Sequence, residues 1–389
     1  MAQAHRVVVA GGGPAAIESL LALRELAGER AALELIAPAS ELVVRAYAVL
    51  APFHEGTEHR YRLGQIAADL GVTLVRDELS SVDSAARTIL LRSGAERSYD
   101  ALIVAIGARP SGPLAGAIAF RGSEDATRLK ALLLESSSGR HQSVAFVIPS
   151  GDTWPLPLYE LALHTRVWLS DRGIARVPLT IVSSEPAPLA SFGSRVSEDV
   201  AQLLTGHGIE FVSGHAIRHY RGRLLLAGGR EVSVEIAIAM SRLEGPAIDG
   251  LPSDEDGFLP VDEHGQVRGV DNVFAAGDAT TFPVKQGGLA TQQADAIARL
   301  LAAQLGADVE PRLAAPVLRA VLYGGREKRY LRAQLGDELE SSSQASSSPL
   351  WPESSKLVGH YLAPYLDTLD EIARQETGEH AALAPDLNP

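Results

Sequence analysis

A strand that runs into a glycine turn and then into a helix lies near the start of this chain, and it restricts the fold more than any other segment. Val7–Ala10 is an uninterrupted apolar run, typical of a strand buried in a parallel sheet. The sequence Gly11-Gly12-Gly13-Pro14-Ala15-Ala16 follows, and it matches the Gly-x-Gly-x-x-Ala turn that holds a pyrophosphate. Gly11 is expected to make the tight turn, Gly13 to let the backbone approach the phosphates, and Ala16 to let the helix pack on the strand. The N–H groups at the helix start would then face the anion.

A second glycine-bearing segment lies near residue 280. Val273-Phe274-Ala275-Ala276-Gly277-Asp278 has the pattern of a strand that ends in a turn, and Lys285-Gln286-Gly287-Gly288-Leu289-Ala290 opens a helix. Either segment alone is a weak signal, because glycine-rich strand ends also serve as ordinary turns. Together they predict one nucleotide site built from both ends of the chain.

Composition sets further bounds. A chain of 389 residues is expected to form two or three domains, and 46% hydrophobic residues is typical of a soluble globular protein. The net charge of −13 argues against nucleic acid or an anionic membrane as the main partner. There is no cysteine, which excludes disulfides, cysteine nucleophiles and thiolate metal sites. No signal peptide, membrane span or metal-ligating histidine spacing stands out, so we expect a cytoplasmic protein without a metal site.

Strands alternate with helices along most of the chain, which predicts an α/β fold with parallel sheets. The expected strands are Val7–Ala10, Leu33–Ala37, Val72–Val75, Ser81–Asp83, Thr88–Arg92, Ala101–Ala105, Ser143–Ile148, Leu179–Ser183, Ile209–Ser213, Leu224–Leu226, Glu235–Ala239 and Gly269–Ala276. The expected helices are Ala15–Leu26, Leu156–Trp168, Val196–His207 and Leu289–Leu305. One domain would comprise residues 1–118 and 246–320, a second 119–245, and a short C-terminal segment 321–389.

The order of the motifs, with Val104-Ala105-Ile106-Gly107 between the two glycine segments, resembles that of flavoproteins with two Rossmann-like dinucleotide-binding domains, as in glutathione reductase. Lys285–Asp295 is similar to a segment shared by sulfide:quinone oxidoreductases and type II NADH dehydrogenases. The resemblance extends over about residues 5–305 and implies non-covalently bound FAD. It does not indicate the substrate.

The resemblance also implies roles for individual residues. Asp278 would accept a hydrogen bond from a ribityl hydroxyl of FAD, and Lys285 would lie near the pyrimidine edge of the flavin, where a cation stabilises its reduced form. Arg45 would lie near the FAD phosphates, with an ordinary surface arginine as the alternative. Gly107 would let the chain pass close to the cofactor, with a plain turn before Pro110 as the alternative. The full expected FAD site is Gly11, Gly13, Pro14, Ala15, Ala16, Ala37, Arg45, Ala105, Gly107, Gly277, Asp278, Lys285, Gly287 and Gly288.

The chain departs from this family pattern at three points. Ala37-Pro38 stands where an acid usually binds the adenosine ribose. Either Ser40 or Glu41 takes over this contact, or the ribose relies on backbone groups and water. The second domain lacks a Gly-x-Gly-x-x-Gly turn, because Pro149–Glu160 contains Trp154 and Pro157, which makes NAD(P)H doubtful. Serine at position 150 and Val321–Tyr323 fall roughly where sulfide:quinone oxidoreductases carry cysteines, so sulfide oxidation by the cysteine route is nearly excluded.

Glu160 is the best candidate for acid/base catalysis. It lies at the start of the second-domain helix, where burial beside Trp154 and Tyr159 would raise its pKa. The alternative is a carboxylate that only complements the helix dipole.

The C-terminal segment has two expected parts. Ser341–Pro349 is serine-rich and is expected to be an exposed linker. Leu357–Ile372 forms an amphipathic stripe interrupted by Pro364, with Lys356 and Arg374 as the nearby basic residues. Because membrane-surface helices usually present more Lys and Arg, we favour packing over the flavin domain or in a homodimer interface over membrane association.

The leading hypothesis is an FAD-dependent oxidoreductase that passes electrons from a small donor to a quinone-like or protein acceptor, with Glu160 and Lys285 assisting at the flavin. A type II NAD(P)H dehydrogenase is the first alternative. A flavin-containing binding or assembly protein with low turnover is the second.

Overall fold

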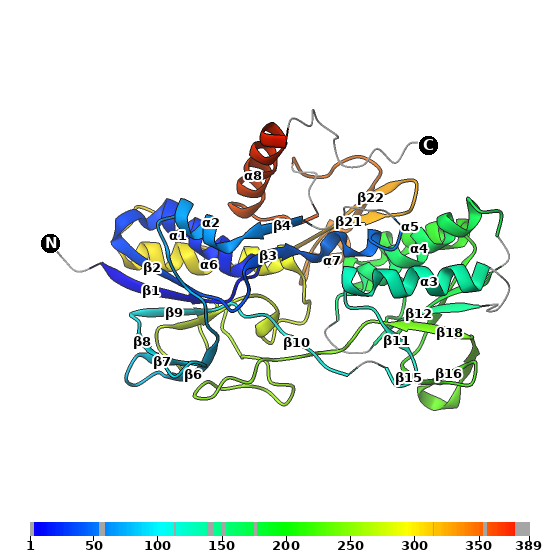
Figure 1. Cartoon of the computed structure of the whole chain (residues 1–389), viewed down its shortest axis with the longest axis horizontal. Helices are drawn as coiled ribbons and strands as arrows, with labels where there is room; N and C mark the ends of the chain where they lie inside the picture. The colour runs from blue at the N-terminus through cyan, green and yellow to red at the C-terminus, as the bar shows by residue number, and fades with distance from the viewer. Residues whose placement is uncertain are drawn as a thin grey trace.

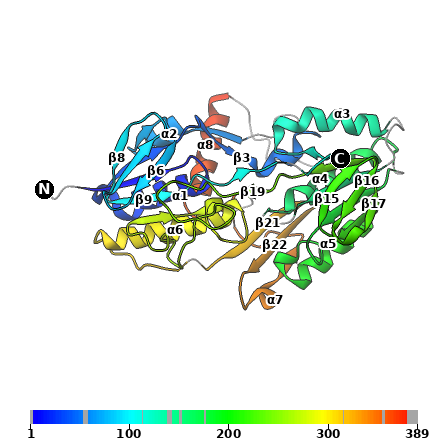
Figure 2. The ribbon, with the colours of Figure 1, turned by 90° about the horizontal axis from the view of Figure 1, so that it is seen from below.

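The computed structural model describes residues 4–53, 59–112, 114–137, 143–149, 153–174, 177–313, 315–352 and 356–377. Two α/β units lie side by side along the long axis, with a C-terminal hairpin between them (Figures 1 and 2). The α/β prediction is thereby confirmed. Serine 150 lies outside the described residues.

The first unit is built on a five-stranded sheet of order β20-β9-β1-β2-β5, in which all strands are parallel. Its strands are β20 (Val273–Ala275), β9 (Ala101–Val104), β1 (His5–Ala10), β2 (Ala31–Ile36) and β5 (Thr73–Val75). Helices α1 (Pro14–Ala27) and α6 (Gly287–Gln304) cover one face. The other face packs on an antiparallel sheet of β6 (Leu79–Asp83), β7 (Thr88–Leu91) and β8 (Glu96–Ser98).

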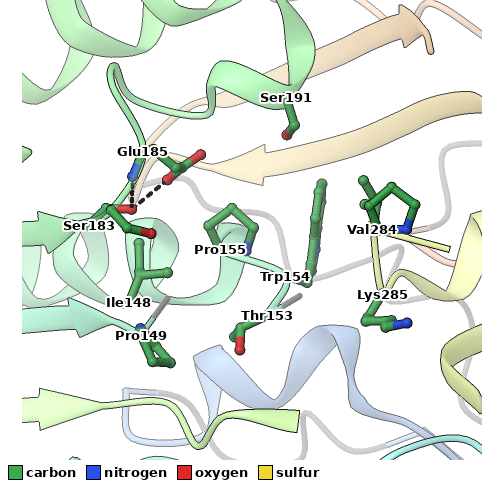
Figure 3. Close-up of a pocket in the computed structure, with 12 residues that line it drawn as sticks. Ile148, Pro149, Thr153, Trp154, Pro155, Ser183, Glu185, Ser191, Val284 and Lys285 are labelled. Atoms are coloured by element: carbon green, nitrogen blue, oxygen red, sulfur yellow. Dashed lines mark hydrogen bonds between the residues drawn. The ribbon is translucent and has the colours of Figure 1, made fainter. Parts of the chain in front are cut away.

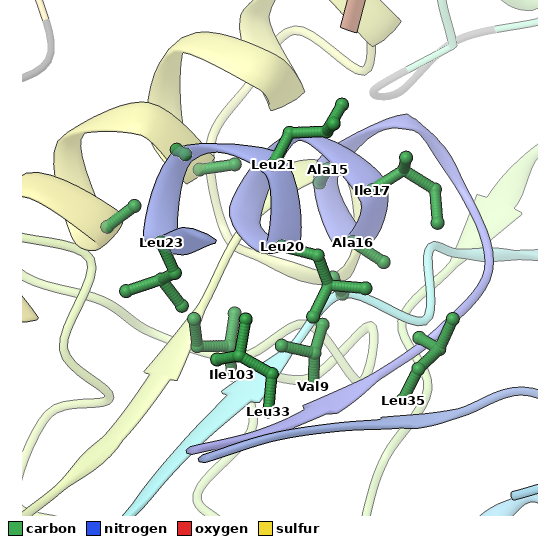
Figure 4. Close-up of a cluster of buried hydrophobic side chains, with 14 of the residues drawn as sticks. Val9, Ala15, Ala16, Ile17, Leu20, Leu21, Leu23, Leu33, Leu35 and Ile103 are labelled. Carbon is green, nitrogen blue, oxygen red and sulfur yellow. The ribbon is translucent and has the colours of Figure 1, made fainter. Parts of the chain in front are cut away.

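The apolar run of β1 is buried on both faces. Val7 and Val9 join the core under α1, together with Leu33 and Ile103 from the neighbouring strands (Figure 4). Val8 packs in a second core that includes residues of β6 and β7. Burial on both faces explains why this strand is continuously apolar rather than alternating.

The second unit repeats this architecture. Its parallel sheet has the order β11-β18-β12-β13-β14, and a three-stranded antiparallel sheet covers one face. The parallel strands are β11 (Ile118–Ala119), β18 (Ile236–Ala239), β12 (Val144–Ile148), β13 (Leu179–Ser183) and β14 (Ile209–Ser213). The helices are α3 (Ala126–Ser137), α4 (Leu156–Ser170) and α5 (Ser194–Gly206). The antiparallel strands are β15 (Ala216–Tyr220), β16 (Arg223–Leu226) and β17 (Glu231–Ser233).

The remaining elements include the connection between the units and shorter segments that pack on them. Two short strands, β10 (Arg109–Pro110) and β19 (Leu243–Glu244), pair where the chain passes between the units. The others are β3 (Glu41–Val44), β4 (His59–Arg62), α2 (Leu63–Asp69), β21 (Val317–Tyr323), β22 (Lys328–Gln334), α7 (Leu339–Ser342), β23 (Gln344–Ser346) and α8 (Leu362–Thr377). Single turns of 3-10 helix are found at η1 (Gly28–Arg30), η3 (Ser123–Asp125), η4 (Ala190–Phe192), η5 (Ala227–Gly229) and η6 (Gly277–Ala279), and a longer one at η2 (Arg45–Leu50).

The outer edge of β21 bridges the two units. The side-chain amide of Gln292 on α6 exchanges two hydrogen bonds of 2.9 Å with the backbone of Val317, and Gln286 donates to the carbonyl of Arg319 at 3.1 Å. At the other end of the strand, the N–H of Tyr323 donates to Glu160 on α4 at 2.8 Å. Side chains of both units therefore satisfy an edge strand that would otherwise expose its polar groups.

Helix α8 packs over the first unit, in line with one of the two expected roles of the C-terminal segment. Glu18 on α1 is fully buried and accepts hydrogen bonds from the N–H groups of Tyr361 at 3.0 Å and Leu362 at 2.7 Å. This carboxylate caps the start of α8. Tyr365 also donates to Asp69 on α2 at 2.6 Å.

Several expectations about individual segments were wrong. The serine-rich stretch is not an exposed linker, because it contains the end of α7 and all of β23, and Ser343 is buried. Pro364 does not interrupt α8, since it lies in the first turn, where its missing N–H is not needed. The strand expected at Gly269–Ala276 is only the three-residue β20.

Other differences concern how the strands pair. Leu224–Leu226 belongs to the antiparallel sheet of the second unit rather than to its parallel one. The domain boundary expected at residue 118 falls inside β11, and the one expected at residue 320 falls inside β21. β16 pairs with its sequence neighbours β15 and β17, and β21 with β22, whereas β11 pairs with the distant strand β18. The choice of pairing partner decides these points, and a local apolar pattern does not show it.

Candidate functional site

The first glycine turn connects the ends of three strands. Gly11 has φ +125°, and a Cβ there would lie 2.1 Å from the carbonyl oxygen of Ala105, so only glycine fits. Its N–H donates to Ile36 at the end of β2 at 2.8 Å. Gly13 differs, because a Cβ there would meet no atom within 4 Å. The turn is therefore closed on the sheet side and open at the start of α1, as a backbone cradle for an anion requires.

The second glycine segment lies beside the first. A Cβ on Gly277 would be 3.0 Å from the Cβ of Ala290 and 3.6 Å from the Cβ of Ala15. The starts of α1 and α6 therefore converge beneath this glycine. Its N–H donates to Gln293 at 2.7 Å, which fixes the turn on α6.

Asp278 and Lys285 follow this turn as opposite charges. Burial raises the pKa of the Asp278 carboxyl, and the positive charges of Lys285 and Arg45 act against this rise. The Lys285 side chain is buried, and its ammonium donates to the carbonyls of Thr280 and, at 2.9 Å, Phe282. It also lies 3.8 Å from the ring centroid of Phe258. Lys285 is thus built into the turn and is not a surface lysine.

Helix α6 begins against the C-terminal segment. A Cβ on Gly287 would lie 3.1 Å from Leu357 and 3.9 Å from Pro14. One on Gly288 would lie 3.1 Å from the Gln286 side chain, which caps the helix by accepting from Leu289 N–H at 2.9 Å. These glycines let the two helix starts and residues 357–358 approach one another closely.

The other expected residues lie around the same edge of the sheet. Ala37 and Ala105 are buried directly after β2 and β9, Gly107 has φ +74° with open space at its Cβ position, and Arg45 is exposed on η2. Glu41, considered as a replacement for the missing ribose-binding acid, accepts from Arg60 at 3.2 Å. The edge gathers these residues because the carboxyl ends of parallel strands meet on one side of a sheet.

Glu160 lies in a buried ion pair that the sequence did not indicate. Its carboxylate is 2.6 Å from the ammonium of Lys356, and the two side chains are only 1% and 3% exposed. Lys356 also donates to the Ala46 carbonyl at 3.1 Å and lies 4.3 Å from the ring centroid of Tyr323. Burial raises the pKa of Glu160 while Lys356 opposes the rise, and burial lowers the pKa of Lys356 while Glu160 opposes the fall.

Both residues have surroundings that the sequence did not reveal. Lys356, expected only as a basic residue near the amphipathic stripe, precedes α8 and points into the protein. The partners of the Glu160 carboxylate are Lys356 and Tyr323, whereas Trp154 packs near Phe192. A lysine beside an apolar stripe is an ambiguous sign, since such side chains more often reach solvent.

Comparison with known proteins identifies the family. The model of the pyridine nucleotide-disulphide oxidoreductases matches residues 5–298. The chain belongs to this family. It is 28% identical over 297 residues to an NADH dehydrogenase-like protein of Mycobacterium tuberculosis, covering 70% of this chain and 72% of that protein. It is 24% identical over 243 residues to a sulfide-quinone reductase of Aquifex aeolicus, covering 57% and 55%.

The solved structures agree with this assignment at the level of the fold. The sulfide:quinone oxidoreductase from Aquifex aeolicus superposes with a TM-score of 0.80 at 19% identity, covering 96% of this chain and 92% of that one. Together with the family match, this confirms the expected fold of two Rossmann-like units. The chain is an FAD-dependent oxidoreductase.

The residues at the edge of the first sheet fit FAD. The turn at Gly11 cannot accept a side chain, and Gly13 leaves the start of α1 open to a pyrophosphate. The start of α6, the half-buried carboxylate of Asp278 and the buried ammonium of Lys285 lie next to this turn. No helix in the described part of the chain is long and apolar enough to cross a membrane.

Proposed function

We propose that this oxidoreductase passes electrons from a reduced donor through FAD to a quinone-like acceptor, and that the Glu160–Lys356 pair supplies a proton to the acceptor. The observation that carries the proposal is the position of this pair. Lys356 directly precedes Leu357, which packs at the start of α6 beside the expected flavin site. On this proposal, the pair would lie near the flavin and hold a proton there.

The chemistry of a quinone explains why such a pair is useful. Bound reduced FAD would supply the two electrons, and conversion of a quinone to a hydroquinone also consumes two protons, of which one would come with the electrons from the reduced flavin and the other from the Glu160–Lys356 pair. Glu160 in its protonated form can donate a proton from its carboxyl, and the ammonium of Lys356 stabilises the carboxylate that remains. The aromatic rings of Tyr47 and Tyr323 border Lys356, and rings of this kind suit a planar acceptor.

The FAD roles of the glycine segments are part of the same proposal. Gly11, Gly13, Pro14, Ala15 and Ala16 would hold the pyrophosphate, Asp278 a ribityl hydroxyl, and Lys285 with the start of α6 the pyrimidine edge. Ala37, Arg45, Ala105, Gly107, Gly277, Gly287 and Gly288 would complete the site. The sulfide-quinone reductase among the relatives supports the acceptor class. The NADH dehydrogenase-like relatives favour NADH as an alternative donor, which depends on the second unit.

The test is reoxidation of the reduced flavin. The protein is reduced anaerobically with dithionite and mixed with a water-soluble benzoquinone in a stopped-flow instrument. Glu160→Gln is expected to slow reoxidation by about 10²- to 10⁴-fold, the usual contribution of a general acid. Glu371→Gln, on the exposed face of α8, is the matched control and should react like the wild type.

Two readouts separate a proton role from a structural one. Flavin content and circular dichroism show whether the variant is folded and loaded. The pH profile of the wild-type rate should fall as Glu160 loses its proton, and the profile of Glu160→Gln should lack that limb. A loaded variant that reoxidises at the wild-type rate would remove Glu160 from the mechanism.

A further inference from the structure

A cavity of about 150 Å³ lies at the carboxyl ends of β12 and β13 in the second unit. The residues that line it come from both units: Ile148, Pro149, Thr153, Trp154, Pro155, Ser183, Ser184, Glu185, Ser191, Pro283, Val284 and Lys285. In an open parallel sheet this edge is where a dinucleotide binds. In a pyridine nucleotide-disulphide oxidoreductase, a pyridine nucleotide would be expected at this edge.

The indole of Trp154 occupies the middle of this region. Figure 3 shows its ring standing between Pro155 on one side and Val284 and Lys285 on the other. The ring is held in place by Phe192, whose centroid is 5.9 Å away and which is itself fully buried. In the first unit the residues between strand and helix are the glycines 11–13, and Gly13 leaves its space open. Among the described residues between β12 and α4 in the second unit, Trp154 places a large side chain beside the cavity.

The start of α4 is also a poor anion site. Pro155 is the N-cap residue and Pro157 is the second residue of the helix, so two backbone N–H groups are missing. The N–H of Leu158 already donates to the Pro155 carbonyl at 3.1 Å. A pyrophosphate at a helix start is held by these N–H groups, and here few of them are left.

The acid at the end of β13 is engaged inside the protein. The carboxylate of Glu185 accepts hydrogen bonds from Tyr159 and Ser183, both at 2.9 Å. Tyr159 is fully buried on α4, so this contact fixes the carboxylate to the helix. An acid at this position would otherwise accept from ribose hydroxyls, and binding a ribose here would require breaking these bonds.

We infer that the second unit does not take a nicotinamide dinucleotide, because Trp154 and the prolines at the start of α4 close the place where its pyrophosphate would lie. A cavity of about 150 Å³ is well below the roughly 300–1,000 Å³ of sites that hold drug-sized ligands. The electrons therefore come from a donor other than NADH or NADPH. This conclusion concerns the donor of the proposed reaction and is independent of its acceptor and of Glu160.

The first experiment is an anaerobic titration of the FAD-loaded protein with NADH and then NADPH, followed by the flavin absorbance. No bleaching is expected at about 1 mM nucleotide, the upper end of common KM values, while dithionite bleaches the flavin fully. Stoichiometric bleaching by either nucleotide would overturn the inference. Quinone reoxidation of dithionite-reduced protein is measured separately, so failure of the proposed function and failure of this inference give different results.

The second experiment tests whether Trp154, Pro155 and Pro157 are the residues that exclude the dinucleotide. Equilibrium dialysis with NADH compares the wild type with a triple variant, Trp154→Gly, Pro155→Gly and Pro157→Ala. The triple variant should bind at least about ten-fold more tightly, a gain of about 1.4 kcal/mol. Trp154→Phe keeps an aromatic ring in place and should bind no better than the wild type. A folded triple variant that binds NADH no better than the wild type would refute the role of these residues.

Discussion

Replacing Lys356 by methionine tests the buried ion pair most directly. The variant keeps most of the side-chain volume and leaves the carboxylate of Glu160, which is only 1% exposed, without its cation. Removing one partner of a buried pair costs about 3–5 kcal/mol, because the remaining charge stays desolvated. The lost hydrogen bond to the Ala46 carbonyl adds to this. We expect Lys356→Met to lose about 3–5 kcal/mol of the free energy of unfolding.

The assay is urea unfolding of the FAD-loaded protein at constant flavin concentration. Lys356→Met is compared with the double variant Glu160→Gln, Lys356→Met, which removes both charges. The double variant should recover most of the loss, since no charge remains buried and the amide oxygen of the introduced glutamine can still accept from the N–H of Tyr323. The loss in Lys356→Met should be smaller at pH 5 than at pH 8, because a lone buried carboxyl has a raised pKa and is more easily neutralised in acid.

An exposed ion pair serves as the control. Arg326 and Asp171 form a contact in which the side chains are 73% and 46% exposed. Arg326→Met should therefore cost at most about 1 kcal/mol. The reasoning from burial would be refuted if Lys356→Met lost no more free energy of unfolding than Arg326→Met. It would also be refuted if the double variant lost more than Glu160→Gln and Lys356→Met together.

Two further predictions concern the first unit. Gly11→Ala should abolish flavin retention, because its Cβ would lie 2.1 Å from the Ala105 carbonyl at φ +125°; the flavin-to-protein absorbance ratio measures this. Gly64→Ala, where a Cβ would meet no atom within 4 Å, is the control, and equal flavin loss in both variants would contradict the argument. Burial raises the pKa of Glu18 to about 7 from 4.5, so the folded protein holds this proton more tightly than the unfolded chain does. The associated stability is complete below pH 4.5 and is lost as the pH rises through 7, by up to roughly 3 kcal/mol. Glu18→Gln should lack this component in urea unfolding at pH 5 and pH 8, and parallel profiles for the two proteins would count against it.

Much of the fold could be predicted because the signals are local. β13 and β14 have the expected bounds, and α1, α4, α5 and α6 differ from expectation by only a few residues at either end. A buried parallel strand must be apolar throughout, and an amphipathic helix must repeat its apolar residues with the helical period. Both requirements appear as apolar patterns within a short stretch of consecutive residues.

The C-terminal segment could not be predicted in the same way. The hairpin of β21 and β22 was not expected, and the serine-rich stretch was mistaken for a linker although Ser343 is buried. The polar residues of this stretch are satisfied by contacts with distant parts of the chain, such as the hydrogen bond from Val196 N–H to Ser343. Composition alone cannot distinguish a polar residue with a distant partner from one that faces water.

The sequence by itself determined the two glycine segments and the α/β fold, since a backbone that must approach a phosphate leaves a fixed pattern of small residues, and its resemblance to a family of flavoproteins indicated FAD. Only the tertiary structure decided that Glu160 is paired with Lys356, which lies 196 residues away in the chain. It also decided that Trp154 stands against Phe192 in the second unit. The physical reason is that burial and charge pairing are properties of positions in space, and residues far apart in sequence acquire them only when the chain has folded.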